Sequence, residues 1–143
     1  MDAYLQPIVV ALDDLLKRVR SCKFASFEDV YETVKEEVIP NGCWKNPLLL
    51  TYDISLRLAY HLDPVGLRLM PKKLLYLHAA PYRSAKMIAQ KIGDGRKAVN
   101  GHVEENYLGK VFDYEHCDPT QKEHVLCRMH KRIKELHGRK DRW

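Results

Sequence analysis

The sequence predicts an all-α fold, a compact bundle of five or more helices, on three observations. The chain has 143 residues, of which 45% are hydrophobic and 30% charged, which is enough for one globular domain to bury a core without disulfides or metal. Apolar residues recur at steps of three and four, as one face of a helix requires. Capping residues, prolines and glycines stand where such segments would begin and end. We therefore expect a single all-α domain that covers residues 1–143.

Two amphipathic helices are expected at the start of the chain. Residues 1–20 place apolar side chains on one helical face, and Pro7 fits the first turn. The second helix follows Ser26, which can cap it, and stops at Pro40-Asn41-Gly42. Its apolar stripe consists of Phe27, Val30, Tyr31, Val34 and Val38.

The segment from Asn46 to Leu62 is expected to be the central, buried helix. Asn46 is a candidate cap, and Pro47 stands at the first helical position, where a missing N–H costs nothing. The segment is apolar nearly all round. Asp53 and Arg57 are the exception, and an acid four residues before a base is the favourable order on a helix. We predict that they form a structural polar pair, with membership of a polar site as the alternative.

Prolines divide the following residues into shorter pieces. Pro71 and the two lysines after it favour a short helix over residues 72–79, although the apolar run from Leu74 to His78 taken alone fits a strand equally well. Another helix is expected from about Pro81 to Ile92. The glycine-rich stretch from Gly93 to Gly101 then predicts an exposed loop, which lacks the spacing and the Gly-Lys-Ser/Thr ending of a phosphate loop.

One further helix is expected to close the domain. Asp118 is its predicted cap, Pro119 occupies the first helical position, and Gln121 completes a capping-box pattern. Gly138 is the expected terminator.

Positive charge is concentrated in the second part of the chain. Residues up to Asp63 contain 7 Lys+Arg against 10 Asp+Glu, and the residues after it contain 17 against 9. A basic half that also carries aromatic residues can meet the phosphates of DNA or RNA without sequence-specific contacts. The alternative is a basic face that is merely solvated. The predicted phosphate contacts are Arg68, Lys72, Lys73, Arg83 and Lys86.

No cofactor and no metal site is predicted. The closest group of metal-type residues contains no CxxC or HxxxH pair that would fix a tetrahedral site, so surface histidines beside a core cysteine are expected. His78, in an apolar run, is expected to be a hydrogen-bonded core or half-core residue, with a ligand or catalytic role as the alternative. A small enzyme using Asp53, Arg57 and His78 around one pocket stays open. The metal-type group is His116, Cys117, His124, Cys127 and His130.

The sequence predicts a cytoplasmic protein without a membrane partner. No apolar run approaches the length of a bilayer span, and acids precede and follow the apolar start, so it does not read as a signal peptide. The four cysteines show no CxxC pair, and free thiols fit a reducing compartment.

Two stretches resemble a family described as 8-oxoguanine DNA glycosylase-like. They are TYDISLRLAYHL, residues 51–62, and KKLLYLHAAPYRSAKMI, residues 72–88. The family pattern is a Tyr-Asp-x-x-Leu-Arg helix followed, after a proline-bearing turn, by Tyr-Leu-His-Ala. HVLCRMHKRI, residues 124–133, is similar to the family's closing helix. The matching positions of the two stretches are Tyr52, Asp53, Leu56, Arg57, Tyr76, Leu77, His78 and Ala79.

The resemblance implies a helix-hairpin-helix glycosylase type of fold rather than an activity. Ala80-Pro81 and Ser84-Ala85 stand where the family has Gly-Thr and a second glycine. The glycosylases hold a DNA phosphate with a glycine-rich hairpin, whereas residues 63–73 contain only Gly66. No Lys/Asp pair stands at a matching position, so no catalytic residue is carried over. We expect a nucleic-acid-binding protein that is not catalytic, with a protein-interaction or structural module as the first alternative and the small enzyme as the second.

Overall fold

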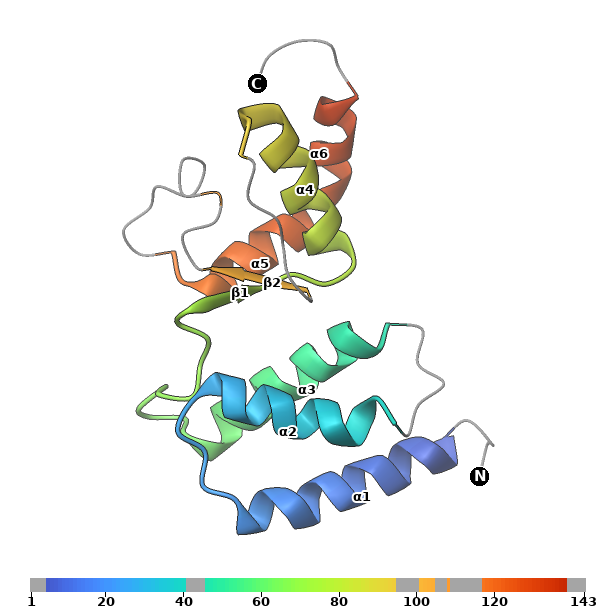
Figure 1. Cartoon of the computed structure of the whole chain (residues 1–143), viewed down its shortest axis with the longest axis vertical. Coiled ribbons are helices and arrows are strands. Elements are labelled where there is room, and N and C mark those ends of the chain that lie inside the picture. The colour runs from blue at the N-terminus through green and yellow to red at the C-terminus, as the bar shows by residue number, and fades with distance from the viewer. Residues whose placement is uncertain (1–4, 41–45, 95–100, 105–107, 109–116, 139–143) are drawn as a thin grey trace. The chain divides into compact units, whose positions relative to one another are not determined.

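The structure is a computed structural model, and it describes residues 5–40, 46–94, 101–104, 108 and 117–138. These residues form six helices and two strands of three residues each, which confirms the predicted all-α class (Figure 1). They fall into two compact units, residues 1–70 and residues 71–143. The single-domain organisation stays a prediction, because the packing inside each unit does not test it. The elements are α1 (Leu5–Ser21), α2 (Phe27–Val38), α3 (Pro47–Leu62), β1 (Leu74–Tyr76), α4 (Ala80–Ile92), β2 (His102–Glu104), α5 (Pro119–Arg128) and α6 (His130–His137).

In the first unit, α2 is the helix that packs against both of its neighbours, α1 and α3. Every residue of its predicted apolar stripe is buried. The expectation that α3 is the central helix is therefore wrong. Although α3 is apolar nearly all round, only one side of it is buried, and that side carries small and hydroxyl side chains beside Tyr52. The ring of Tyr52 meets that of Phe27 edge to face, with centroids 6.0 Å apart.

The hydroxyl groups on the buried side of α3 are satisfied within the helix. Thr51 Oγ1 donates to the carbonyl oxygen of Pro47 over 2.7 Å, and Ser55 Oγ donates to that of Thr51 over 2.6 Å. These bonds to the preceding turn let polar side chains be buried without an unpaired group. As a result α3 packs closely through small residues, and its leucines stay partly exposed.

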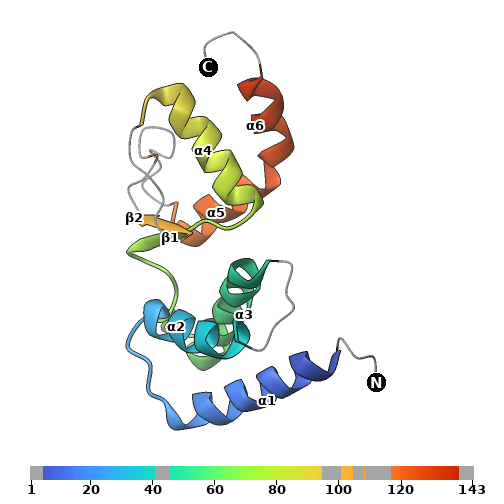
Figure 2. The same ribbon diagram turned by 45° about the vertical axis from the view of Figure 1, so that its right-hand side comes forward.

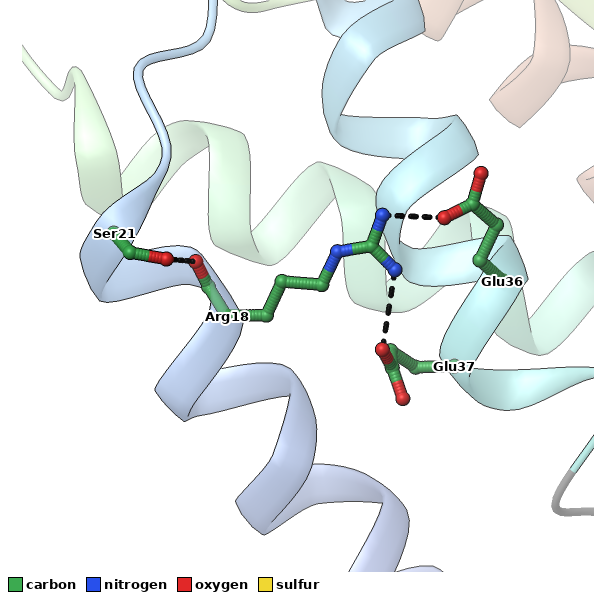
Figure 3. Close-up of polar contacts among 4 residues, drawn as sticks. All are labelled: Arg18, Ser21, Glu36 and Glu37. Carbon is green, nitrogen blue, oxygen red and sulfur yellow. Dashed lines mark hydrogen bonds and ion pairs between the residues drawn. The ribbon is translucent and has the colours of Figure 1, made fainter.

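Arg18 joins α1 to α2 (Figure 3). Its Nη1 donates to Glu37 Oε1 over 3.1 Å, and its Nη2 donates to Glu36. Hydrogen bonds to Glu36 and then Glu37 raise the pKa of the guanidinium. On the same helix, Leu15 and Val19 are buried. The two helices are thus held together by buried apolar side chains and by the bonds from Arg18 to the two glutamates.

The predicted helix caps are confirmed at two of three positions. Ser26 and Asp118 each accept a hydrogen bond from the backbone N–H three residues later, and each has the extended backbone, with ψ of 169° and 167°, that aims a side chain at the helix. Gln121 completes the second capping box as expected. Asn46 precedes α3 as predicted but its side chain makes no capping bond, and its ψ of 76° is far from the extended values of the other two caps.

In the second unit, residues 74–76 form a strand, so the prediction of a helix over residues 72–79 is wrong. Strand β1 pairs with β2 in antiparallel register, with Leu75 opposite Val103 and Tyr76 opposite His102. The partner strand is distant in sequence, and it supplies the hydrogen bonds that a helix would have made internally. The following helix, α4, matches its prediction and ends at Gly93 in the left-handed conformation. Most of the predicted loop from Gly93 to Gly101 lies outside the described residues.

The closing segment is two helices rather than the one predicted. Helix α5 ends and α6 begins at Met129, and both Figure 1 and Figure 2 show the two helices running in different directions. Both contribute to one core, in which Leu126 of α5 and Ile133 of α6 are buried. The change of direction places both of these side chains in the core. Gly138 follows α6 as expected. The other buried core residues are Leu75, Leu77, Ala85, Ile88, Ala89, Val103 and Leu108.

Candidate nucleic-acid interface

Helices α4 and α6 lie side by side and run in the same direction (Figures 1 and 2). Near their N-terminal ends, Ser84 Oγ and His130 Nδ1 share a hydrogen bond of 2.8 Å. Near their C-terminal ends, His137 Nε2 donates to Gln90 Oε1 over 3.1 Å. Because the first bond joins the two beginnings and the second joins the two ends, the pair is parallel and in register. We call this line of contact the α4–α6 seam.

The exposed side of α4 next to the seam is basic. Successive residues of an α-helix are turned by about 100°, so Arg83 and Lys86 lie on nearly the same side, opposite the buried Ala85 and Ile88. Gln90, which bonds to α6, lies between them around the helix. Both cations are exposed, and α4 contains no acidic residue.

The exposed side of α6 next to the seam is basic as well. His130 and His137 face α4, Ile133 faces the core, and Lys134 and Lys131 follow around the outer surface. Both helices run the same way with the core on the same side, so these lysines lie on the same outer surface as Arg83 and Lys86. We call these four side chains the basic face: Arg83, Lys86, Lys131 and Lys134.

Within the described residues, no carboxylate bonds to a cation of the basic face, although Glu135 lies one helical turn from Lys131 on α6. The single acid of α6, Glu135, pairs with Arg132 over 3.3 Å. By the same helical geometry Arg132 points away from the seam. In the part of the chain that the structure describes, no hydrogen bond or ion pair holds the four cations of the basic face. They are therefore available to an anionic ligand.

The five predicted phosphate contacts are divided by the structure. Arg83 and Lys86 belong to the basic face, while Lys72 and Lys73 are exposed ahead of β1 and outside it. Arg68 lies in the first unit. Lys131 and Lys134 were not predicted, although their spacing around the buried Ile133 would have shown that they are exposed.

Arg68 is held in a turn by Asp63. Its Nε donates to Asp63 Oδ2 over 2.9 Å, and the same carboxylate accepts from the backbone N–H groups of Arg68 and Gly66, each over 3.1 Å. The side-chain hydrogen bond from Arg68, followed by the backbone bonds, lowers the pKa of Asp63. The charge of Arg68 is thus matched by a carboxylate.

Asp53 and Arg57 both lie on the exposed side of α3. Partial desolvation raises the pKa of Asp53, and the charge of Arg57 acts in the opposite direction. No hydrogen bond or ion pair joins them within the described residues. Their proposed structural role stays a prediction.

His78 is buried at 5% exposure beside the strand pair. Desolvation, and secondly the nearby His102, lower the pKa of His78 to about 4, so the ring is neutral at neutral pH. Its ring lies beside that of Tyr76, with centroids 6.4 Å apart. Asp53 and Arg57 belong to the first unit and His78 to the second, so neither unit by itself contains the trio of the predicted enzyme site.

The predicted group of metal-type residues is partly described. His116 lies outside the described residues, His130 bonds to Ser84, and His124 and Cys127 are exposed on α5. Among the residues that the structure covers, no three His, Cys, Asp or Glu side chains are placed to hold one ion.

Helix α1 carries an exposed apolar stripe. Val9, Leu12 and Leu16 are 49%, 41% and 51% exposed, whereas Leu15 and Val19 are buried. The apolar side of α1 is therefore wider than the part that α2 covers.

No protein-family model, curated protein or solved structure matches this chain. The resemblance to the 8-oxoguanine DNA glycosylase-like family thus stays a prediction. Over the described residues, no helix combines the length and the apolar character that crossing a membrane requires.

Proposed function

We propose that this chain is a cytoplasmic protein that binds nucleic acid, DNA or RNA, through the basic face, and that it does so without catalysis. The observation that supports this most directly is the placement of Arg83, Lys86, Lys131 and Lys134 on one side of a rigid helix pair. Phosphates attract such a surface whatever the base sequence. The helix-hairpin-helix glycosylase type of fold belongs to the same proposal, since it rests on the resemblance alone.

The α4–α6 seam adds to the case because it fixes the geometry of the cations. Arg83 and Lys86 are one turn apart on α4, and Lys131 and Lys134 are one turn apart on α6, which is about 4.5 Å along each axis. Neighbouring helix axes lie about 8–10 Å apart. The four charges therefore form a compact patch that meets several consecutive phosphates together.

The test is the salt dependence of binding to labelled oligonucleotides, followed by fluorescence anisotropy. Four phosphate contacts predict that log K falls with log salt concentration with a slope of about −3. Lys131→Gln and Lys134→Gln should each weaken binding and make that slope less steep by about 0.7 to 0.9.

Lys73→Gln is the matched control, because the same substitution removes the same charge from an exposed position of the second unit outside the basic face, whereas Arg132→Gln would free Glu135 to pair with Lys131. It should keep the wild-type affinity and slope. Equal losses in Lys73→Gln and Lys131→Gln would mean that only net charge matters, and no binding at low salt would end the proposal.

The protein-interaction module remains the second candidate, and the exposed stripe of Val9, Leu12 and Leu16 favours it. An apolar surface of this kind on one helix is a common feature of protein interfaces. The two candidates are separable, since charge-neutralising substitutions on α6 leave α1 unchanged.

A further inference from the structure

We infer that the basic face binds a single strand in preference to a duplex, with an unpaired base stacked on Tyr82. This inference rests on the proposed function. Tyr82 is in the first turn of α4, immediately before Arg83 and one helical turn before Lys86. It is 36% exposed, whereas Tyr76, the other described tyrosine of the same unit, is 3% exposed.

The position of Tyr82 puts an aromatic ring at the edge of the basic face. Residues four apart on a helix lie on the same side, so the ring of Tyr82 borders the side chain of Lys86. Proteins that hold single strands combine a basic surface for the backbone with aromatic rings on which bases stack. Tyr82 beside Arg83 and Lys86 provides both elements within one turn.

The width of the helix pair argues against entry into a duplex groove. One α-helix with its side chains is about 10–12 Å across and fills the major groove, which is about 12 Å wide. Helices α4 and α6 are tied together at both ends by the Ser84–His130 and Gln90–His137 bonds. With axes about 8–10 Å apart, the pair is about 20 Å wide and cannot enter that groove side by side.

A duplex could therefore touch the basic face only through its backbone, and Tyr82 would gain no partner, because paired bases are already stacked on each other. A single strand offers both its phosphates and its base faces. Only a single strand can contact the cations with its phosphates and the exposed ring with a base.

The experiment compares three labelled probes of about 12 nucleotides at low salt: oligo-dU, oligo-U and a duplex of the same length. The full chain should bind either single strand more tightly than the duplex. Oligo-dU and oligo-U differ only in the 2′-hydroxyl, so the ratio of their affinities shows whether that group contributes, and so distinguishes DNA from RNA as the natural ligand.

Tyr82→Ala should weaken single-strand binding by about 5- to 150-fold and leave duplex binding unchanged. Tyr82→Phe is the control, since it keeps the ring and should keep the affinity. Tyr82 is exposed, so neither variant should alter the helical circular dichroism.

Two results would overturn the inference: equal affinity for duplex and single strand, or an unchanged affinity for single strands in Tyr82→Ala. In either case binding that still depends on Lys131 and Lys134 would leave the proposed function standing. Failure of all three probes to bind would remove both together.

Discussion

Acid should destabilise the second unit through His78. The folded chain holds this imidazole with a pKa of about 4, against 6.5 for an ordinary histidine. Burial is the larger cause, and His102 is the second. Because the lowered pKa favours the neutral ring, the unfolded chain takes up a proton before the folded chain does. Stability should therefore fall as the pH drops below about 6.5, and the loss should be complete below about pH 4.

The size of the effect follows from the two pKa values. Their difference corresponds to about 3 kcal/mol of unfolding free energy once both states are protonated, at 1.36 kcal/mol for each pKa unit. At about pH 5 the expected loss is about 2 kcal/mol, since the unfolded state is already protonated and the folded state is largely neutral. Because the His78 side chain is only 5% exposed, solvent screening reduces this effect little.

The assay is urea denaturation of the wild type and of His78→Gln between about pH 7 and pH 5. Hydrogen exchange at Leu77, the residue after β1, whose N–H donates to the carbonyl of Gly101, assigns the transition to the second unit. The wild type should lose more stability than the variant over this range. His102→Gln, which removes only the second cause, should keep most of the pH dependence.

Parallel losses of stability in the wild type and His78→Gln as the pH falls would show that His78 is not the source of the acid sensitivity. The comparison is between slopes, so a constant offset from substituting a buried residue does not affect it. Carboxylates that titrate at lower pH contribute equally to both proteins and cancel in the difference.

Three further substitutions probe the same unit. Gly101→Ala should cost more than Gly93→Ala in urea denaturation, although both glycines have positive φ, of 80° and 71°. A Cβ at Gly101 would lie 2.4 Å from the ring of His78, whereas one at Gly93 would meet nothing within 4 Å, so only the backbone cost of about 1 kcal/mol applies there. Equal costs would contradict the close approach of Gly101 to His78. Ser84→Ala should lower the unfolding free energy by about 1 kcal/mol by removing the bond to His130, and an unchanged midpoint would show that this bond does not hold the α4–α6 seam.

The parts of the fold that depend on local chemistry were predicted from the sequence. The capping bonds of Ser26 and Asp118 join residues three positions apart, so the few residues around each cap contain all the information needed. The apolar stripe of α2 was equally predictable, because apolar residues on the buried side of a helix recur every three to four positions. Asn46 shows the limit, since the residue type suits a cap but its backbone does not.

The parts that depend on distant contacts were not predicted. Strand β1 forms because residues 102–104 pair with it, and no local pattern indicates that partner. The change of direction at Met129 occurs without glycine or proline, the usual local signals for ending a helix. The packing of α5 and α6 into one core accounts for it, and that packing is visible only in the folded chain.

The candidate site follows the same division. Arg83 and Lys86 are predicted because they lie in the basic region that follows the helix from Asn46 to Leu62. Lys131 and Lys134 join them only because α6 lies parallel to α4. The parallel packing is shown by the Ser84–His130 and Gln90–His137 hydrogen bonds, whose partners are 46 and 47 positions apart in the sequence. The compactness of the basic face is thus a tertiary property.

Charge counting shows which half of the chain is basic, but pairing decides which cations have no carboxylate partner. In the first unit, carboxylates hold the charged groups of Lys17, Arg18, Lys35 and Arg68. Residues 71–143 contain 16 Lys+Arg against 9 Asp+Glu, so acids there cannot match every cation. On α4 and α6, Arg132 has the single acid of the two helices as its partner. A phosphate that approaches the basic face therefore displaces no carboxylate, whereas one that approaches Arg68 competes with Asp63. This difference is the physical reason to expect binding at Lys131 and Lys134 rather than at Arg68.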